Sequence, residues 1–141
     1  MLFDISTGKA ITRLPHETQF HAWTNTSRLS ASDYEAILYK IDQMINGDEI
    51  HTAGWMPGNN WSGTPFQTIY EKACQYNENS AALCFGQFVF LAFMHRNEAW
   101  ACGRYEKDGI PIQSLTYFRV PKLDASISSA RKIQIHQKRK G

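Results

Sequence analysis

Apolar residues recur at helical spacing in the first half of the chain, starting just after Ser32. Ser32 and Glu35 have the spacing of a capping box, and Gly47 is the kind of residue that ends a helix. This pattern predicts a helix over 33–46. Its apolar stripe consists of Tyr34, Ile37, Leu38, Ile41, Met44 and Ile45.

A segment of turn-forming and aromatic residues, 54–65, separates this helix from the next. A short extended piece over 49–53 leads into the segment. The next helix is expected to have Thr64 as N-cap, with Pro65 at its first position and Gln67 as the capping partner. Its stripe predicts a helix that ends near Tyr76, and the members are Phe66, Ile69, Tyr70 and Ala73.

The most apolar stretch of the chain is 81–94, where twelve of fourteen residues are apolar. Its length favours a buried helix, and the alternative is a helix that runs into a strand, because 88–93 is dense in aromatic and branched side chains. The stretch falls short of the ~20 residues needed to span a bilayer. An apolar run of this size is difficult to enclose in a small domain, so we expect a homodimer.

Two β-like runs, 98–105 and 110–120, predict a hairpin whose turn contains Asp-Gly at 108–109. Pro111 would place its strand at an edge. Residues 1–30 hold short apolar groups between turn formers, and one or two short strands are expected there. Together these elements predict a single α+β domain, with about three helices packed with a small antiparallel sheet.

Composition and charge divide the chain into a body and a tail. The 141 residues are 43% hydrophobic and 20% charged, which fits one globular domain. Residues 121–141 carry six basic and one acidic side chain, whereas residues 1–120 carry nine basic and twelve acidic ones. We therefore expect a domain over 1–120 and a basic tail over 121–141 that is partly helical and frayed at its end.

The cysteines and histidines show no pattern of known chemistry. Cys74, Cys84 and Cys102 form neither a disulfide framework nor a Cys-x-x-Cys motif, and three buried thiols are expected. The five histidines are scattered, so neither a metal site nor a cofactor is predicted, and no catalytic residue is assigned. The first residues lack the features of a signal peptide, which predicts a cytoplasmic protein.

The 54–65 segment is the strongest candidate for a binding site. Trp55 and Trp61 flank Asn59 and Asn60 in a loop long enough to indicate function. Flat rings beside amides suit a planar or sugar-like ligand, with His51 as a further polar contact. A structural alternative is equally compatible with the pattern: both indoles could form a lid over the core. The loop lacks the lysine of a phosphate-binding loop, which excludes nucleotide hydrolysis.

A second function class is a nucleic-acid binder. The predicted order of helix, short strand, two helices and hairpin is that of a winged helix. Its third helix, 81–94, offers only Gln87 to read base edges, so sequence-specific recognition by this helix is not expected. Salt-dependent phosphate binding would then fall to the tail, through Arg131, Lys132, Lys138, Arg139 and Lys140.

Two stretches resemble small uncharacterised proteins carried on bacterial integron gene cassettes. They are Gly54-Trp-Met-Pro-Gly-Asn-Asn-Trp-Ser-Gly-Thr-Pro-Phe66 and Gly103-Arg-Tyr-Glu-Lys-Asp-Gly109. The resemblance covers at most residues 45–120 and brings no catalytic residue with it. It implies a bacterial, accessory, soluble protein.

Overall fold

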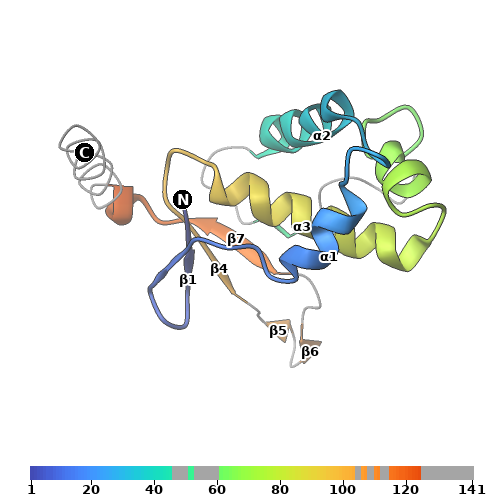
Figure 1. Ribbon diagram of the computed structural model, residues 1–141. Coiled ribbons are helices and arrows are strands. Elements are labelled where there is room, and N and C mark those ends of the chain that lie inside the picture. Colours follow the sequence, from blue (N-terminus) through green and yellow to red (C-terminus); the bar gives the residue numbers. More distant parts are fainter. Residues whose placement is uncertain (46–50, 53–60, 104–105, 108–109, 112–114, 125–141) are drawn as a thin grey trace.

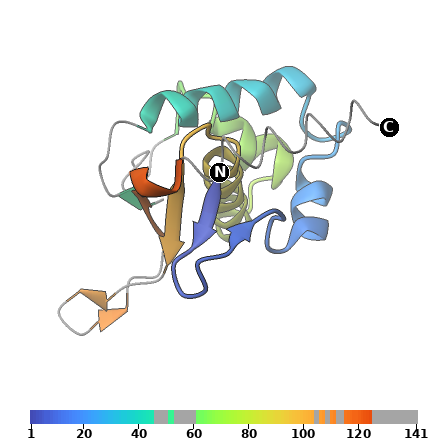
Figure 2. The same cartoon turned by 90° about the vertical axis from the view of Figure 1, so that its left-hand side faces the viewer.

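One long helix, α3 (Glu78–Met94), forms the centre of the molecule (Figures 1 and 2). The computed structural model describes residues 1–45, 51–52, 61–103, 106–107, 110–111 and 115–124. Helices α1 (Glu17–Trp23) and α2 (Ala31–Met44) pack against α3, and a sheet lies along another of its sides. The arrangement confirms the predicted α+β class.

The main sheet has five strands in the order β2-β1-β4-β7-β3. Its pairs are antiparallel except for β1 with β4, which run parallel, so the sheet is mixed where only antiparallel pairing was expected. The parallel pair joins the first strand to one almost a hundred residues later in the chain. The strands are β1 (Leu2–Asp4), β2 (Ala10–Ile11), β3 (His51–Thr52), β4 (Trp100–Gly103) and β7 (Thr116–Arg119).

The predicted hairpin forms as two separate antiparallel strand pairs. Strands β4 and β7 pair antiparallel, and beyond them β5 (Glu106–Lys107) pairs with β6 (Ile110–Pro111) in a separate two-stranded sheet. Each strand of this outer pair is therefore an edge strand, as Pro111 predicted, because proline has no N–H to donate to a second neighbour.

Helix α2 begins two residues earlier than predicted. Its cap is Ser30, whose hydroxyl accepts a hydrogen bond from the Asp33 backbone N–H at 3.1 Å. The predicted capping box of Ser32 and Glu35 is therefore wrong, and a Ser30 cap with Asp33 in the first turn replaces it. An acidic side chain there also favours the positive end of the helix dipole. The helix ends at Met44, and Gly47 lies outside the described residues.

The segment predicted as a second α-helix winds differently. Residues 64–69 form successive turns with i to i+3 hydrogen bonds, and a five-residue π-helix, η2 (Ile69–Ala73), follows. Thr64 does use its hydroxyl to accept from the Phe66 N–H, at 3.3 Å, but the α-helix that follows covers only Gln67 and Thr68 before η2 begins. The predicted end at Tyr76 lies in the turn before α3.

The apolar stretch is a helix throughout. Asn77 caps α3 by accepting a hydrogen bond from the Ser80 N–H at 2.9 Å, which starts the helix three residues before the predicted 81. The alternative of a helix running into a strand is wrong. The side chains of α3 that are buried are Ala81, Cys84, Phe85, Phe88, Val89, Phe90, Leu91, Ala92 and Phe93.

The first thirty residues contain two short strands, as expected, and a helix that was not predicted. Helix α1 has only two buried apolar side chains, Phe20 and Trp23, three residues apart. The residue at its start, His16, has φ 53° and makes no side-chain cap. A two-turn helix without a recognisable cap leaves no pattern from which it can be identified.

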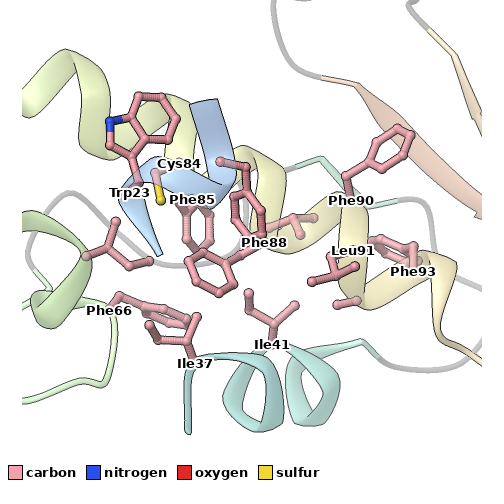
Figure 3. Close-up of a cluster of buried hydrophobic side chains, with 14 of the residues drawn as sticks. Trp23, Ile37, Ile41, Phe66, Cys84, Phe85, Phe88, Phe90, Leu91 and Phe93 are labelled. Carbon is pink, nitrogen blue, oxygen red and sulfur yellow. The ribbon is translucent and has the colours of Figure 1, made fainter. Parts of the chain in front are cut away.

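Aromatic side chains join the helices to each other and to the sheet. Phe88 of α3 contacts Phe20 of α1 edge-on, with ring centroids 5.0 Å apart. On the sheet side, Phe93 stacks on Tyr117 at 4.1 Å and meets Trp100 at 4.9 Å. Figure 3 shows that Phe88 and Phe93 lie among buried side chains from several elements. These contacts make α3 the element around which the core is built.

The described chain ends in a short 3-10 helix, η3 (Pro121–Leu123), and Asp124. Asp124 accepts two hydrogen bonds from the guanidinium group of Arg119, both at 2.9 Å, and a third from the Ala99 N–H at 2.8 Å. The start of the predicted tail is thus fixed to strand β7. The remainder of the tail, 125–141, lies outside the described residues.

Candidate functional site

The candidate binding loop starts at one edge of the main sheet. Strand β3 pairs antiparallel with β7, with His51 opposite Tyr117 and Thr52 opposite Thr116. This pairing fixes the backbone of His51 beside the sheet. The predicted contacts Trp55, Asn59 and Asn60 lie outside the described residues, as does the side chain of His51.

The loop ends at Trp61, which is held against the helical core. Its ring centroid lies 5.5 Å from that of Phe85 on α3 and 6.3 Å from that of Phe66. Phe66 and Phe85 contact each other edge-on at 5.1 Å and are both buried. Trp61 itself is half-buried. Trp61 thus contacts one aromatic ring that follows it closely in the chain, Phe66, and one on the central helix, Phe85.

A tight turn fixes the backbone of Trp61. Its carbonyl oxygen accepts from the Thr64 N–H at 3.0 Å and from the Thr64 hydroxyl at 2.7 Å. Gly63 has φ 77°, a backbone conformation that the third position of a type II turn requires and that glycine adopts without strain. Gly63 and Thr64 therefore fix the backbone from which the indole of Trp61 extends.

A buried hydroxyl without a partner lies where the loop begins. Thr116, 6% exposed, sits opposite Thr52, and its Oγ1 makes no hydrogen bond with any residue that the structure describes. Leaving such a group unpaired costs about 1–3 kcal/mol, which a ligand or water at the site would offset. The Oε1 of Gln87 on α3 is likewise buried and unpaired. Thr116 gave no signal in the sequence, since it lies inside a β-like run.

The structure also brings two cysteines together. Cys74 directly follows η2, Cys84 lies in α3 against which η2 packs, and both belong to the same buried core, where each thiol affects the pKa of the other. All three cysteines are free and buried, as predicted. No sequence pattern indicates the pair, because nine residues separate the two positions and neither belongs to a motif.

The pair has an asymmetric environment. The hydrogen bond from Cys84 lowers the pKa of the Cys74 thiol against the opposing effect of burial, and the charge of Arg28 adds to the lowering. The same hydrogen bond and burial raise the pKa of Cys84. Arg28 donates to the Ala73 carbonyl at 3.2 Å, which places its guanidinium group beside the end of η2. Burial raises the pKa of the third thiol, Cys102, to about 11, and Asp4 contributes.

The turn between the two cysteines is strained. Gln75 and Tyr76 both have positive φ, 51° and 68°, although neither is glycine. This conformation costs roughly 1–2 kcal/mol per residue. The Tyr76 ring, 67% exposed, contacts Tyr70 edge-on at 5.4 Å. Strain of this kind is concentrated at functional and switching sites.

Helix α3 cannot act as a DNA-recognition helix. A recognition helix must expose its side chains to the major groove, whereas most of α3 is buried by α1, α2, η2 and the sheet. Gln87, its candidate base contact, is half-buried. The tail residues proposed for phosphate binding, 131–140, lie outside the described residues.

The described part of the chain contains neither a metal-binding group of side chains nor a helix that could span a membrane. There, no three His, Cys, Asp or Glu side chains are grouped closely enough to bind a metal ion. Among the same residues, no helix has both the length and the apolar character needed to cross a bilayer.

Comparison with protein-family models, curated proteins and solved structures finds no match.

Proposed function

We propose that this chain is a small cytoplasmic binding protein whose 54–65 loop recognises a planar or sugar-like ligand, or a protein partner that presents such a group. The observation that supports it is the anchoring of both loop ends. Strand β3 fixes the start through its pairing with β7, and Trp61 fixes the end against Phe66 and Phe85. A loop held at both ends on a rigid scaffold can present side chains at low entropic cost.

The two tryptophans of the loop have different roles in this proposal. Trp61 belongs to the scaffold, because its ring contacts two buried phenylalanines. Trp55 is the binding surface, with the amides of Asn59 and Asn60 as hydrogen-bonding groups. The sequence allowed two interpretations of the loop, a binding site and a lid over the core. The proposal combines them: the indole of Trp61 is structural, and the indole of Trp55 contacts the ligand.

Polar contacts are proposed at the sheet edge. His51 is opposite Tyr117 and one residue from Thr52, whose partner Thr116 has an unpaired hydroxyl. A ligand hydroxyl or amide that reached Thr116 would satisfy this buried group. Sugars and planar heterocycles both provide such groups next to an apolar face.

The test is a thermal-shift screen of monosaccharides, nucleosides and planar aromatic acids, followed by affinity measurements on two variants. Trp55→Ala should reduce the affinity of the strongest hit at least tenfold with little change in stability, whereas Trp61→Phe, the matched control, should keep the affinity and lose only a little stability. A screen without any stabilising compound, or a hit that Trp55→Ala binds unchanged, would contradict the proposal.

Self-association is a second part of the proposal, and it concerns the exposed side of α3. The apolar run was expected to need a partner, but α3 buries most of it within one chain. Leu83, 62% exposed, is the large apolar side chain of this run that remains on the surface. We therefore propose a homodimer that uses Leu83 as a contact.

The alternative function is nucleic-acid binding through the tail. One observation favours it: Asp124, the single acidic residue of 121–141, is paired with Arg119 of the domain. The six basic side chains of the tail are therefore not balanced by a free carboxylate in the same segment. Such binding would be independent of sequence and would weaken steeply with salt.

A further inference from the structure

The strongest chemistry outside the candidate loop is the pair of thiols between η2 and α3. Cys74 is 6% exposed and Cys84 is fully buried, and both side chains belong to the same buried cluster. They belong to different elements that pack against each other, so a covalent bond between them would link η2 to the central helix. Figure 3 places Cys84 within the cluster of buried side chains.

Access to this pair is provided by the segment that precedes α3. Cys74 is followed at once by Gln75 and Tyr76, the two residues with positive φ. It is preceded by a π-helix of only five residues, and the Tyr76 ring is mostly exposed. A strained turn beside a short, irregular helix opens more readily than the middle of α3, so a small molecule reaches Cys74 before Cys84.

We propose that Cys74 and Cys84 form an oxidation site, at which a hydroperoxide converts the two thiols into a disulfide between η2 and α3. Cys74 is the attacking thiol and Cys84 the resolving one. Three observations assign these roles: the slight exposure of Cys74, the guanidinium group of Arg28 beside it, and the complete burial of Cys84.

The reaction balances with one hydroperoxide. The Cys74 thiolate attacks the terminal peroxide oxygen and the O–O bond breaks, which leaves a sulfenic acid on Cys74 and releases the other oxygen as water or an alcohol after protonation. The Cys84 sulfur then attacks the Cys74 sulfur, the S–O bond breaks, and the hydroxyl group leaves as water with the Cys84 proton. Two thiols are oxidised and the peroxide is reduced.

Cys102 provides an internal control. It is buried on strand β4, in the part of the sheet next to Asp4, and burial raises the pKa of its thiol. Thiolate character and exposure set the rate of oxidation, so Cys102 should react much more slowly than Cys74. The protein therefore contains one reactive pair and one inert thiol.

The experiment uses the full chain and hydrogen peroxide as the probe. After exposure, the protein is unfolded and treated with N-ethylmaleimide, and its intact mass and peptides are measured. We expect one maleimide on Cys102, the loss of two hydrogen atoms, and a peptide that links Cys74 to Cys84. Three maleimides at peroxide levels that oxidise a free thiol, or a disulfide that includes Cys102, would overturn the proposal.

Two variants separate the roles of the thiols. With Cys84→Ala the reaction should stop at a Cys74 sulfenic acid, which dimedone traps, whereas Cys102→Ala should form the same disulfide at the wild-type rate. Dimedone on Cys102 in place of Cys74 would overturn the assignment. If Cys84→Ala does not fold, the peptide map of the wild-type protein still decides whether the pair is oxidised.

Discussion

The indole of Trp61 lies against the ring of Phe85, with the two centroids 5.5 Å apart and the planes inclined at 45°. This contact fastens the end of the 54–65 loop to the central helix. The loop is therefore attached at two places: to the sheet through β3 at its start, and to α3 through Trp61 near its end. The proposal assigns the anchoring role to Trp61 and the ligand contact to Trp55.

Removing the Trp61 ring should destabilise the protein. Trp61→Ala loses contacts with Phe66 and Phe85, and we expect a cost of about 2 kcal/mol, below the roughly 3–5 kcal/mol of a fully buried tryptophan, because Trp61 is half-buried. Urea denaturation followed by circular dichroism measures the change. Trp61→Phe should lose less than half as much. Equal stability of wild type and Trp61→Ala would show that the anchor contributes nothing.

The pair of Arg119 and Asp124 predicts a pH dependence. The hydrogen bonds from Arg119 and from the Ala99 N–H lower the pKa of Asp124 to about 2, from an ordinary value of about 3.9. A lowered pKa in the folded state means that the stabilisation is complete above pH ~4 and is lost as the pH falls through about 2.

Melting temperatures of wild type and Asp124→Asn between pH 7 and pH 2 test this relationship. The wild type should be more stable at neutral pH, and the difference should shrink below pH ~4. A difference that stayed constant to pH 2 would mean that the carboxylate charge of Asp124 does not stabilise the fold.

Replacing the exposed apolar residue of α3 should disrupt self-association. Leu83→Glu introduces a charge at a position that is 62% exposed, so the fold should be retained while the dimer dissociates. Multi-angle light scattering at micromolar concentration measures the mass. Tyr39→Glu, at an exposed position on α2, is the matched control. A wild-type mass of about 16.1 kDa would remove the dimer from the proposal.

The bonds of Asp124 decide where the chain should be cut to test nucleic-acid binding by the tail. A truncation after Val120 would also remove Asp124, which binds Arg119 and the Ala99 N–H. A chain that ends at Asp124 keeps these bonds and removes five of the six basic residues of 121–141. If the tail binds nucleic acid, this truncation should abolish retention on heparin at low salt. Retention with an unchanged salt dependence would place the phosphate contacts in the domain.

The sequence predicted the elements that carry a strong local pattern. Helix α2 and the stretch that became α3 were predicted because their apolar residues are periodic or continuous, and the hairpin because Asp-Gly marks its turn. Helix α1 was missed, since two apolar residues and an uncapped His16 leave no pattern. The parallel pairing of β1 with β4 depends on contacts across the chain that no local pattern records.

The candidate site was predictable only in part. Trp61 and Phe66 are close in the sequence, so a single turn is enough to bring their rings together, as the structure shows. The proximity of Cys74 to Cys84 and the unpaired hydroxyl of Thr116 both depend on how elements pack, and the sequence contains no signal for either. Such tertiary relationships appear only once the fold is assembled.

Iodide quenching of tryptophan fluorescence tests the central claim most directly. Trp100 is fully buried, Trp23 is 8% exposed and Trp61 is half-buried, so Trp55 should provide most of the accessible emission. We predict that Trp55→Phe removes the readily quenched fraction, and that the strongest compound of the thermal-shift screen shields this fraction in the wild type. Quenching that is unchanged in Trp55→Phe and unaffected by every stabilising compound would contradict a binding surface at Trp55.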